Sequence, residues 1–325
     1  MASKACLCRG SISKLSCSLE LTSDIDEFYL LPHIVRPGET IASTGFSRKT
    51  GGKGANQAFA CGRAGGRVVL DGNIGADGEA AKRFIESGGV DVSRVHVLDG
   101  ERAADGENSI VLHAGANARA DANGPQLEGY THVLLQNEIP LVDTVAYMRE
   151  AGARGLTTIY NPSPMPSVAE LRVFPWDCLK FLIVNEGELE AILDAYEKVP
   201  VDAGLSVAEA SIIRMKALHA AKEFNPKIVI VTTIGPDGVL ALVPGQEIQS
   251  FPAVPAKKVV DTTGAGDTFA GYFTAMLMEK GDDAPLKDIF PTCITASTLA
   301  VENPGAMESI PARADVDARV ATLNL

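Results

Sequence analysis

A glycine-rich turn near the C-terminal end of the chain has residue types that suit phosphate chemistry. The segment VDTTGAGDTFAGYF, residues 260–273, places Gly264, Gly266 and Asp267 ahead of an apolar helical pattern. A helix that begins at this turn would point unpaired N–H groups and the positive end of its dipole at an anion. Asp267 would lie in the first helical turn, as a general base or only as a helix cap. The turn is not a dinucleotide fingerprint, because Phe269 stands at the third glycine position.

A second glycine cluster opens an alanine-rich helical pattern. The segment TGGKGANQAFACGRAGG, residues 50–66, contains Lys53 and Asn56. It is not a P-loop, because Ser47 stands where the first glycine belongs and Gly54 where a magnesium-binding Ser or Thr belongs. Lysine and amide groups suit a polyhydroxylated ligand, whereas a solvated lysine and a helix-capping asparagine are the structural alternative.

The composition limits the partners of the chain. Its 325 residues, 46% of them hydrophobic, are enough for one large α/β domain with a sizeable core. A formal net charge of -12 would repel nucleic acid and anionic lipid, so we expect neither as a partner. The apolar runs fall far below the roughly 20 residues that a membrane helix needs. A phosphorylated ligand must therefore be held by local dipoles, one lysine or bound cations.

The cysteines and the terminal segments bear on the compartment. The six cysteines are scattered without a CxxC pair, so we expect free thiols in a reducing compartment. The five histidines include no HExxH motif, which argues against zinc chemistry. The serine-rich, basic N-terminal segment faintly resembles a transit peptide, and the final LNL distantly resembles a peroxisomal SKL signal. We expect a cytoplasmic protein, with a peroxisome-like organelle as the alternative, and treat residues 1–13 as an extension.

Strand-like and helical patterns alternate along residues 14–325. The first strand is predicted at LSCSLELT, and further strands at RVVLDGNIG, SIVLHAG, HVLLQNEI, LTTIYNP, FLIVNE, IVIVTTIG and KVVDTT. Helical patterns between many of them predict a mainly parallel sheet covered on both faces, with ligands at the carboxyl ends of the strands. Residues 27–50 and 93–114 are rich in Gly, Pro, Ser and charge, and we expect them to form a small β lid.

The two glycine clusters together resemble the paired signatures of the ribokinase family of carbohydrate kinases. GGKGANQ and DTTGAGD carry this resemblance, and HAGAN (113–117), YNPSP (160–164) and VNEGE (184–188) match the family in the same order. The resemblance implies a ribokinase-like three-layer α/β/α fold with a small β lid. It also implies ATP-dependent phosphorylation of D-ribose at the 5-hydroxyl, which gives D-ribose 5-phosphate and ADP. The alternatives are a related kinase for a nucleoside, another pentose or a ketohexose, and a non-catalytic sugar-binding relative.

The resemblance also implies roles for individual residues. The family's sugar-binding positions correspond here to Asp24, Asp26, Gly52, Lys53, Asn56, Glu138 and Asp267. Asp24 replaces an asparagine of the family, so its role is open. The catalytic positions correspond to Gly264, Ala265 and Gly266, which form an anion hole, and to Asp267, which is the base. The ATP-binding positions correspond to Asn185, Thr233, Ile234, Gly235, Gly238, Gly266 and Asp267.

Two cations are implied beside ATP. Glu188, in an NxxE motif with Asn185, matches a position that organises Mg²⁺ through water. The family's monovalent cation site, which takes K⁺, corresponds to Asp261, Thr263, Ala300, Asn303, Gly305 and Ser309. Both cations would offset the charge of ATP in an acidic protein.

The chain departs from the family pattern in two segments. Between DGERA (99–103) and GENSIVLHAGAN (106–117), residues that form a further lid strand in the family are missing. That strand contributes to sugar cover and to the dimer contact in the family, so the shortening bears on lid closure and on the expected homodimer. The segment YEKVPVDAGLSVAEAS (196–211) is longer than usual, and we expect a surface insertion there.

Overall fold

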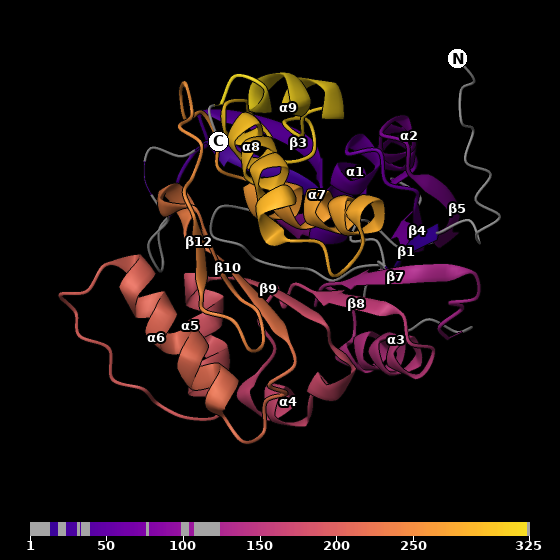
Figure 1. The fold of residues 1–325 in the computed structure, drawn as a ribbon. Coiled ribbons are helices and arrows are strands. Elements are labelled where there is room, and N and C mark those ends of the chain that lie inside the picture. The colour runs from indigo at the N-terminus through magenta and orange to yellow at the C-terminus, as the bar shows by residue number, and fades with distance from the viewer. Residues whose placement is uncertain are drawn as a thin grey trace, which may run out of the picture.

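The computed structural model describes residues 14–18, 24–30, 33, 40–75, 78–98, 104–106 and 124–323, and a nine-stranded sheet is its central element (Figure 1). The strands of this sheet are β1 (Lys14–Ser18), β4 (Val68–Gly75), β5 (Asp91–Leu98), β7 (Tyr130–Leu135), β8 (Thr157–Tyr160), β9 (Phe181–Asn185), β10 (Val229–Thr233), β11 (Val239–Leu242) and β12 (Gln249–Phe251). Their order is β12-β11-β10-β9-β8-β7-β1-β4-β5. The pairs from β10 to β5 are parallel, and β11 and β12 add an antiparallel edge.

Helices cover both faces of the sheet, which confirms the predicted α/β/α layers (Figure 1). One face carries α1 (Lys53–Arg63), α2 (Glu79–Ser87), α7 (Ala265–Lys280), α8 (Phe290–Val301) and α9 (Arg313–Val320). The other face carries α3 (Leu141–Ala153), α4 (Val168–Val173), α5 (Glu186–Asp194) and α6 (Val207–Ala220). Short 3-10 helices are η3 (Trp176–Cys178), η4 (Gly235–Asp237) and η5 (Leu286–Asp288). No helix of the described ranges is long and apolar enough to cross a membrane.

Alternate residues of the strands from β7 to β11 enter two separate hydrophobic cores. On β7, Leu134 belongs to the core beneath α1, α7 and α8, whereas Val133 and Leu135 belong to the core beneath α3, α5 and α6. This alternation is the period of two along a strand. Because both faces are covered, a central strand such as β9 is apolar almost throughout, as is usual for parallel sheets.

A second, three-stranded sheet contains β2 (Asp24–Leu30), β3 (Gly45–Gly51) and β6 (Ala104–Gly106), with β2 in the middle. It overlaps the segments that we expect to form a lid. Residues 93–98 do not belong to it, because they lie in β5 and pair with β4 at the edge of the large sheet. The predicted strand SIVLHAG and the N-terminal extension lie outside the described residues. Since β3 ends next to Gly52, the small sheet adjoins the start of α1.

The strand prediction for KVVDTT, residues 258–263, is wrong. These residues pair with neither sheet, and the N–H groups of Val260 and Asp261 donate to the Val301 carbonyl, at the end of α8, over 2.8 and 3.3 Å. The side chains of Val259 and Val260 are exposed. Paired valines favour a strand by propensity, but here the backbone of the segment pairs with the end of α8, so tertiary context decides the outcome.

A polar cluster fixes the C-terminal end of α7 to the sheet. Asp282, just beyond α7, shares a hydrogen bond with His132 Nε2 (2.8 Å) and accepts one from Lys180 Nζ (3.1 Å). The hydroxyl of Thr157 also donates to this carboxylate. Burial by itself would raise the pKa of Asp282, but the hydrogen bonds from His132 and Thr157 outweigh burial and hold the pKa well below its ordinary value. The helix is therefore joined to residues of β7 and β8 and to the residue before β9.

Asp282→Asn is expected to lower the free energy of unfolding by about 2 kcal/mol at neutral pH, the order of a hydrogen bond to a charged group. A carboxyl whose native pKa is depressed stabilises the fold above its unfolded pKa and loses that contribution as the pH falls through the native value. The deficit of the variant should therefore persist at neutral pH and shrink below a pH of about 4. Urea unfolding across this range measures it. Asp283→Asn, at a fully exposed carboxylate one residue further on, is the control, and an equal deficit in both variants would contradict the assignment.

Candidate active site

Polar segments follow neighbouring parallel strands at one edge of the large sheet. Leu135 at the end of β7 pairs with Tyr160 at the end of β8, and Asn185 at the end of β9 pairs with Thr233 at the end of β10. The segments that begin at Gln136, Asn161, Glu186 and Ile234 therefore gather at the carboxyl edge. This edge is where ligands bind in open α/β sheets.

Asp267 lies at this edge in the first turn of α7, and only 7% of its surface is exposed. Its Oδ2 accepts a hydrogen bond from Asn56 Nδ2 at 3.0 Å, and its Oδ1 accepts one from Gln57 Nε2 at 2.9 Å. Both carboxylate oxygens therefore face α1 and not the N–H groups of their own helix. The interpretation of Asp267 as only a helix cap is not supported by these contacts.

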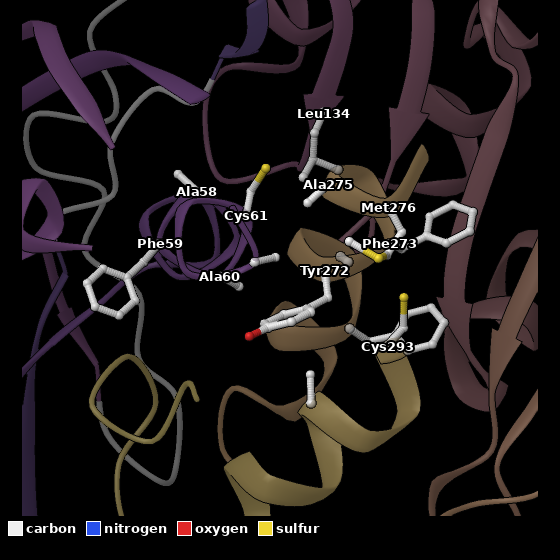
Figure 2. Packing of buried hydrophobic residues seen from close by; sticks show 14 of the residues in the cluster. Ala58, Phe59, Ala60, Cys61, Leu134, Tyr272, Phe273, Ala275, Met276 and Cys293 are labelled. Atoms are coloured by element: carbon white, nitrogen blue, oxygen red, sulfur yellow. The ribbon is translucent and has the colours of Figure 1, made fainter. Parts of the chain in front are cut away.

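Close packing of α1 against α7 sets this geometry. A Cβ atom at Gly271 would lie 2.4 Å from the carbonyl oxygen of Gln57 and 2.5 Å from Ala60 Cβ, so only glycine permits this approach. Figure 2 shows the same contact further along, where Cys61 of α1 lies beside Ala275 of α7. The two helices thereby bring both glycine motifs of the sequence to one place.

The glycine-rich turn starts α7 in a conformation that favours glycine. Gly264 has φ +77° and ψ 0°, in the left-handed region, and a Cβ there would lie 3.0 Å from Ala306 Cα. The Ala265 N–H donates to the Thr262 carbonyl at 3.3 Å, and Gly266 is exposed with open space beside its Cα. Because N–H groups in a first helical turn lack carbonyl partners within the helix, an anion at this turn would meet backbone donors.

The start of α1 lies against Glu138, which follows β7. Glu138 Oε2 accepts hydrogen bonds from the backbone N–H of Lys53 at 2.8 Å and of Gly54 at 3.4 Å. Gly52, with φ +92°, makes the turn into the helix. A carboxylate is favourable at a helix N-terminus, so Glu138 has a structural role beside the sugar contact that the resemblance implies.

The small sheet brings the two aspartates of β2 toward the start of α1. Asp24 pairs with Gly51, the residue before Gly52, and Asp26 pairs with Lys49. The backbone thus places Asp24 beside the second glycine cluster and Asp26 two residues further along the same face. The side chains of both aspartates lie outside what the structure describes.

The NxxE motif forms the N-terminus of α5. Asn185 Oδ1 accepts a hydrogen bond from the Glu188 N–H at 2.8 Å, and the Asn185 N–H donates to Glu188 Oε2 at 2.9 Å, which makes a capping box. Burial raises the pKa of Glu188, the backbone hydrogen bond from Asn185, the charge of Lys53 and the Ser163 hydroxyl lower it, and the charge of Asp267 raises it. Lys53 and Asp267 therefore both lie within electrostatic reach of Glu188.

The predicted nucleotide turn connects β10 to β11. Thr233 lies beside Asn185 in register, and Ile234 is buried and donates its N–H to the Gly238 carbonyl at 2.9 Å. Gly235 and Gly238 have φ +56° and +104°, and a Cβ at Gly238 would lie 2.1 Å from a carbonyl oxygen of β12. The turn thus places the residues assigned to ATP next to the start of α5.

Asp261 joins the two loops that carry the predicted potassium site. Its Oδ1 accepts hydrogen bonds from Thr263 N at 3.0 Å and Thr263 Oγ1 at 2.7 Å, and its Oδ2 accepts one from Gly305 N at 2.9 Å. The carboxylate is therefore engaged by backbone and hydroxyl donors, and its place in the site is to hold the loops together.

The remaining positions of that site lie in the second loop. The Asn303 N–H donates to the Ala300 carbonyl at 3.0 Å, and the buried Ser309 hydroxyl donates to the Ala306 carbonyl at 2.8 Å. Over the described ranges, no group of three or more His, Cys, Asp or Glu side chains could hold a metal ion. The resemblance implies that a cation between these loops is held through backbone carbonyls.

Three amide side chains near Asp267 received no role from the sequence motifs. They are Gln57, Gln136 and Asn161. Gln57 donates a hydrogen bond to Asn161 and accepts one from Gln136. A polar residue directly after a buried strand, as at 136 and 161, is the signal that could have identified two of them. Among the described residues, Asn56 Oδ1 and Gln136 Oε1 are buried acceptors that no donor reaches, and such atoms suit ligand hydroxyls.

Comparison with known proteins places the chain in one family. The family model "pfkB family carbohydrate kinase" matches residues 17–313. A ribokinase of Bacillus subtilis (strain 168) is 32% identical over 321 residues, which are 93% of this chain and 96% of that protein. A ribokinase of Haemophilus influenzae is 29% identical over 308 residues, 89% of this chain and 92% of that protein.

A solved structure shares the fold closely. The crystal structure of ribokinase from Cryptococcus neoformans var. grubii serotype A, in complex with ADP, is 44% identical with a TM-score of 0.87. The match covers 95% of this chain and 100% of that chain.

Proposed function

The chain belongs to the pfkB family of carbohydrate kinases, and we propose that it transfers the γ-phosphoryl group of ATP to the 5-hydroxyl of D-ribose. The products are D-ribose 5-phosphate and ADP. The observation that carries this proposal is the buried Asp267 carboxylate, held by two amides beside a helix N-terminus. Ribokinases of Haemophilus influenzae and Bacillus subtilis match over nearly the full length, and the structure with 44% identity is a ribokinase in complex with ADP.

Asp267 supplies the general base. As the 5-hydroxyl attacks the γ-phosphorus in line, its proton passes to the carboxylate, and the leaving group is ADP. The backbone N–H groups at residues 264–266 donate to the phosphoryl oxygens, and Lys53 adds positive charge near the reacting groups. In phosphoryl transfer, such positioning and charge stabilisation provide most of the catalysis.

Residues on both sides of Asp267 bind the two substrates. Ribose lies against the small sheet and the start of α1, where Asp24, Asp26, Gly52, Lys53, Asn56 and Glu138 contact it. The buried Asn56 Oδ1 accepts a hydrogen bond from a sugar hydroxyl. ATP lies against the start of α5 and the β10–β11 turn, with Asn185, Thr233, Ile234, Gly235 and Gly238 as its contacts. The small sheet acts as the lid over ribose.

The residues present fit the two cations. Glu188 has a raised pKa and lies within electrostatic reach of Asp267, so a nearby Mg²⁺, held through water, would favour its ionised form. The loops joined by Asp261 and Gly305 would hold K⁺ through the carbonyls at the positions assigned above. When bound, these cations offset the charge of the phosphates.

The test of this function is ADP release with ribose, 2-deoxyribose, fructose, adenosine or pyridoxal as the acceptor, with and without potassium. Turnover that depends on ribose and increases with potassium is the expected result. A preference for adenosine would overturn the substrate and leave the kinase chemistry in place. Binding of ribose without ADP release would favour the non-catalytic relative. The homodimer and the cytoplasmic location stay predictions, and the mass of the assembly in solution tests the first of them.

A further inference from the structure

We propose that Gln57 is a positioning residue for phosphoryl transfer, which fixes the carboxylate of Asp267 through a relay of buried amides. This inference rests on the proposed role of Asp267 as the base. Gln57 lies in GGKGANQ directly after the predicted sugar contact Asn56. The sequence motifs assigned it no role.

The amide of Gln57 is fully used by its surroundings. Its Nε2 donates to Asp267 Oδ1 at 2.9 Å and to Asn161 Oδ1 at 3.1 Å, and its Oε1 accepts from Gln136 Nε2. A glutamine amide has two N–H donors and one carbonyl oxygen, so each of these groups has a partner. Gln57 is also completely buried, so water does not compete for these bonds.

These contacts permit only one orientation of the amide. Asn161 Nδ2 donates to the Ile183 carbonyl at 3.0 Å, so Asn161 Oδ1 has to face Gln57. A rotated Gln57 amide would place its oxygen against Asn161 Oδ1 and the Asp267 carboxylate, and its N–H groups against the donor of Gln136. Repulsion at all of these contacts disfavours that state. The sheet backbone thereby determines which group of Gln57 meets the base.

The two amides that donate to Asp267 are held by different contacts. Asn56 also carries the buried acceptor that suits a ligand hydroxyl, so its amide serves both sugar and base. Gln57 contacts the strand ends through Asn161 and Gln136, and its backbone carbonyl packs against Gly271 of α7. We infer that Gln57 holds the base in place independently of the sugar. A base aimed in advance lowers the cost of reaching the reactive geometry.

Gln57→Glu tests the relay, because it keeps the shape of the side chain and replaces the donor to Asp267 by a second carboxyl group. Two facing carboxyl groups share a proton, so the acidic limb of the kcat against pH profile should move to higher pH. At pH 7, kcat should fall about tenfold or more, while KM for ribose stays close to that of the unsubstituted protein. The other charged groups that act here, Lys53 on α1 and Glu188 on α5, are unchanged in the variant.

The control is Thr274→Val, which removes a buried hydroxyl from α7 away from the base. This variant should keep the kcat and the pH profile of the unsubstituted protein. Gln57→Asn is the second test variant, because its shorter amide cannot reach Asp267 and adds no charge. It should lower kcat without adding a second titrating carboxyl group beside the base, and it decides the matter if Gln57→Glu does not fold.

Unchanged kcat in the folded Gln57 variants would overturn the relay. An increase in KM for ribose at constant kcat would also overturn it, because Gln57 would then be a sugar contact. Equal losses in Thr274→Val would show that the effect belongs to helix packing and would also overturn it. The unsubstituted protein, assayed in parallel, separates the two proposals. If it does not phosphorylate ribose, the proposed function fails; if it does and the Gln57 variants match it, only the relay fails.

Discussion

Asp267→Asn is expected to fold normally and to lose at least about a hundredfold in kcat, the usual contribution of a positioned general base. The substituted side chain has the same shape, but an amide cannot take the proton of the attacking hydroxyl. It also replaces one carboxylate oxygen by an N–H donor that faces the donor of Asn56 or Gln57, so one hydrogen bond is lost. Steady-state ADP release at saturating ribose and ATP measures the loss.

The matched control for that variant is Asp283→Asn, which makes the same change of charge at a fully exposed side chain. It should keep full turnover. Because the carboxylate of Asp267 takes the proton in the transition state, KM for ribose should change much less than kcat. Near-normal kcat in Asp267→Asn would contradict the assignment of the base, and so would a loss of equal size in the control.

Gly271→Ala is expected to lower both stability and turnover. The added methyl group would lie 2.4 Å from the Gln57 carbonyl oxygen and 2.5 Å from Ala60 Cβ, so α1 has to move away from α7. Overpacking of this kind costs about 1–3 kcal/mol of unfolding free energy. The same movement carries Asn56 and Gln57 away from Asp267, so kcat falls in the fraction that remains folded.

Thermal unfolding and the kcat of the folded protein together check this prediction. Gly204→Ala is the control, because a Cβ there makes an ordinary contact of 3.4 Å with Asp202 in an exposed loop. If Gly271→Ala unfolds at the same temperature as the unsubstituted protein, α1 and α7 leave room for a methyl group at this position, which contradicts the prediction. If stability falls and kcat per folded molecule does not, the contact supports the fold and not the site.

The sequence motifs predicted residues that the structure brings together at the candidate site, because they mark the ends of strands and the starts of helices. Glu138 follows β7 at the carboxyl edge of the large sheet, and the packing of α1 against α7 brings Gly52, Lys53, Asn56 and Asp267 to the same place. The alternation of strands and helices likewise predicted the three layers. These features depend on local patterns that persist in the fold.

Features that depend on tertiary contacts were not predictable from local patterns. The valines of 258–263 favour a strand by propensity, yet that segment pairs with the end of α8. Residues 93–98 have lid-like composition but join the large sheet. The orientation of Gln57 follows from Asn161, more than a hundred residues away in the chain, and sequence spacing contains no sign of that contact. The NxxE motif also forms a helix cap, which its resemblance to a metal site alone does not reveal.

The most direct test of the proposed function is the position of the phosphate on the product formed from D-ribose and ATP, read by proton-coupled phosphorus NMR. We expect one sugar phosphate, whose phosphorus couples to the two methylene protons at carbon 5, and we expect Asp267→Asn to form it at least about a hundredfold more slowly than the unsubstituted protein. A phosphate on another hydroxyl, no sugar phosphate from the unsubstituted protein, or the same product at an equal rate from the variant would contradict ribose 5-hydroxyl transfer with Asp267 as the base.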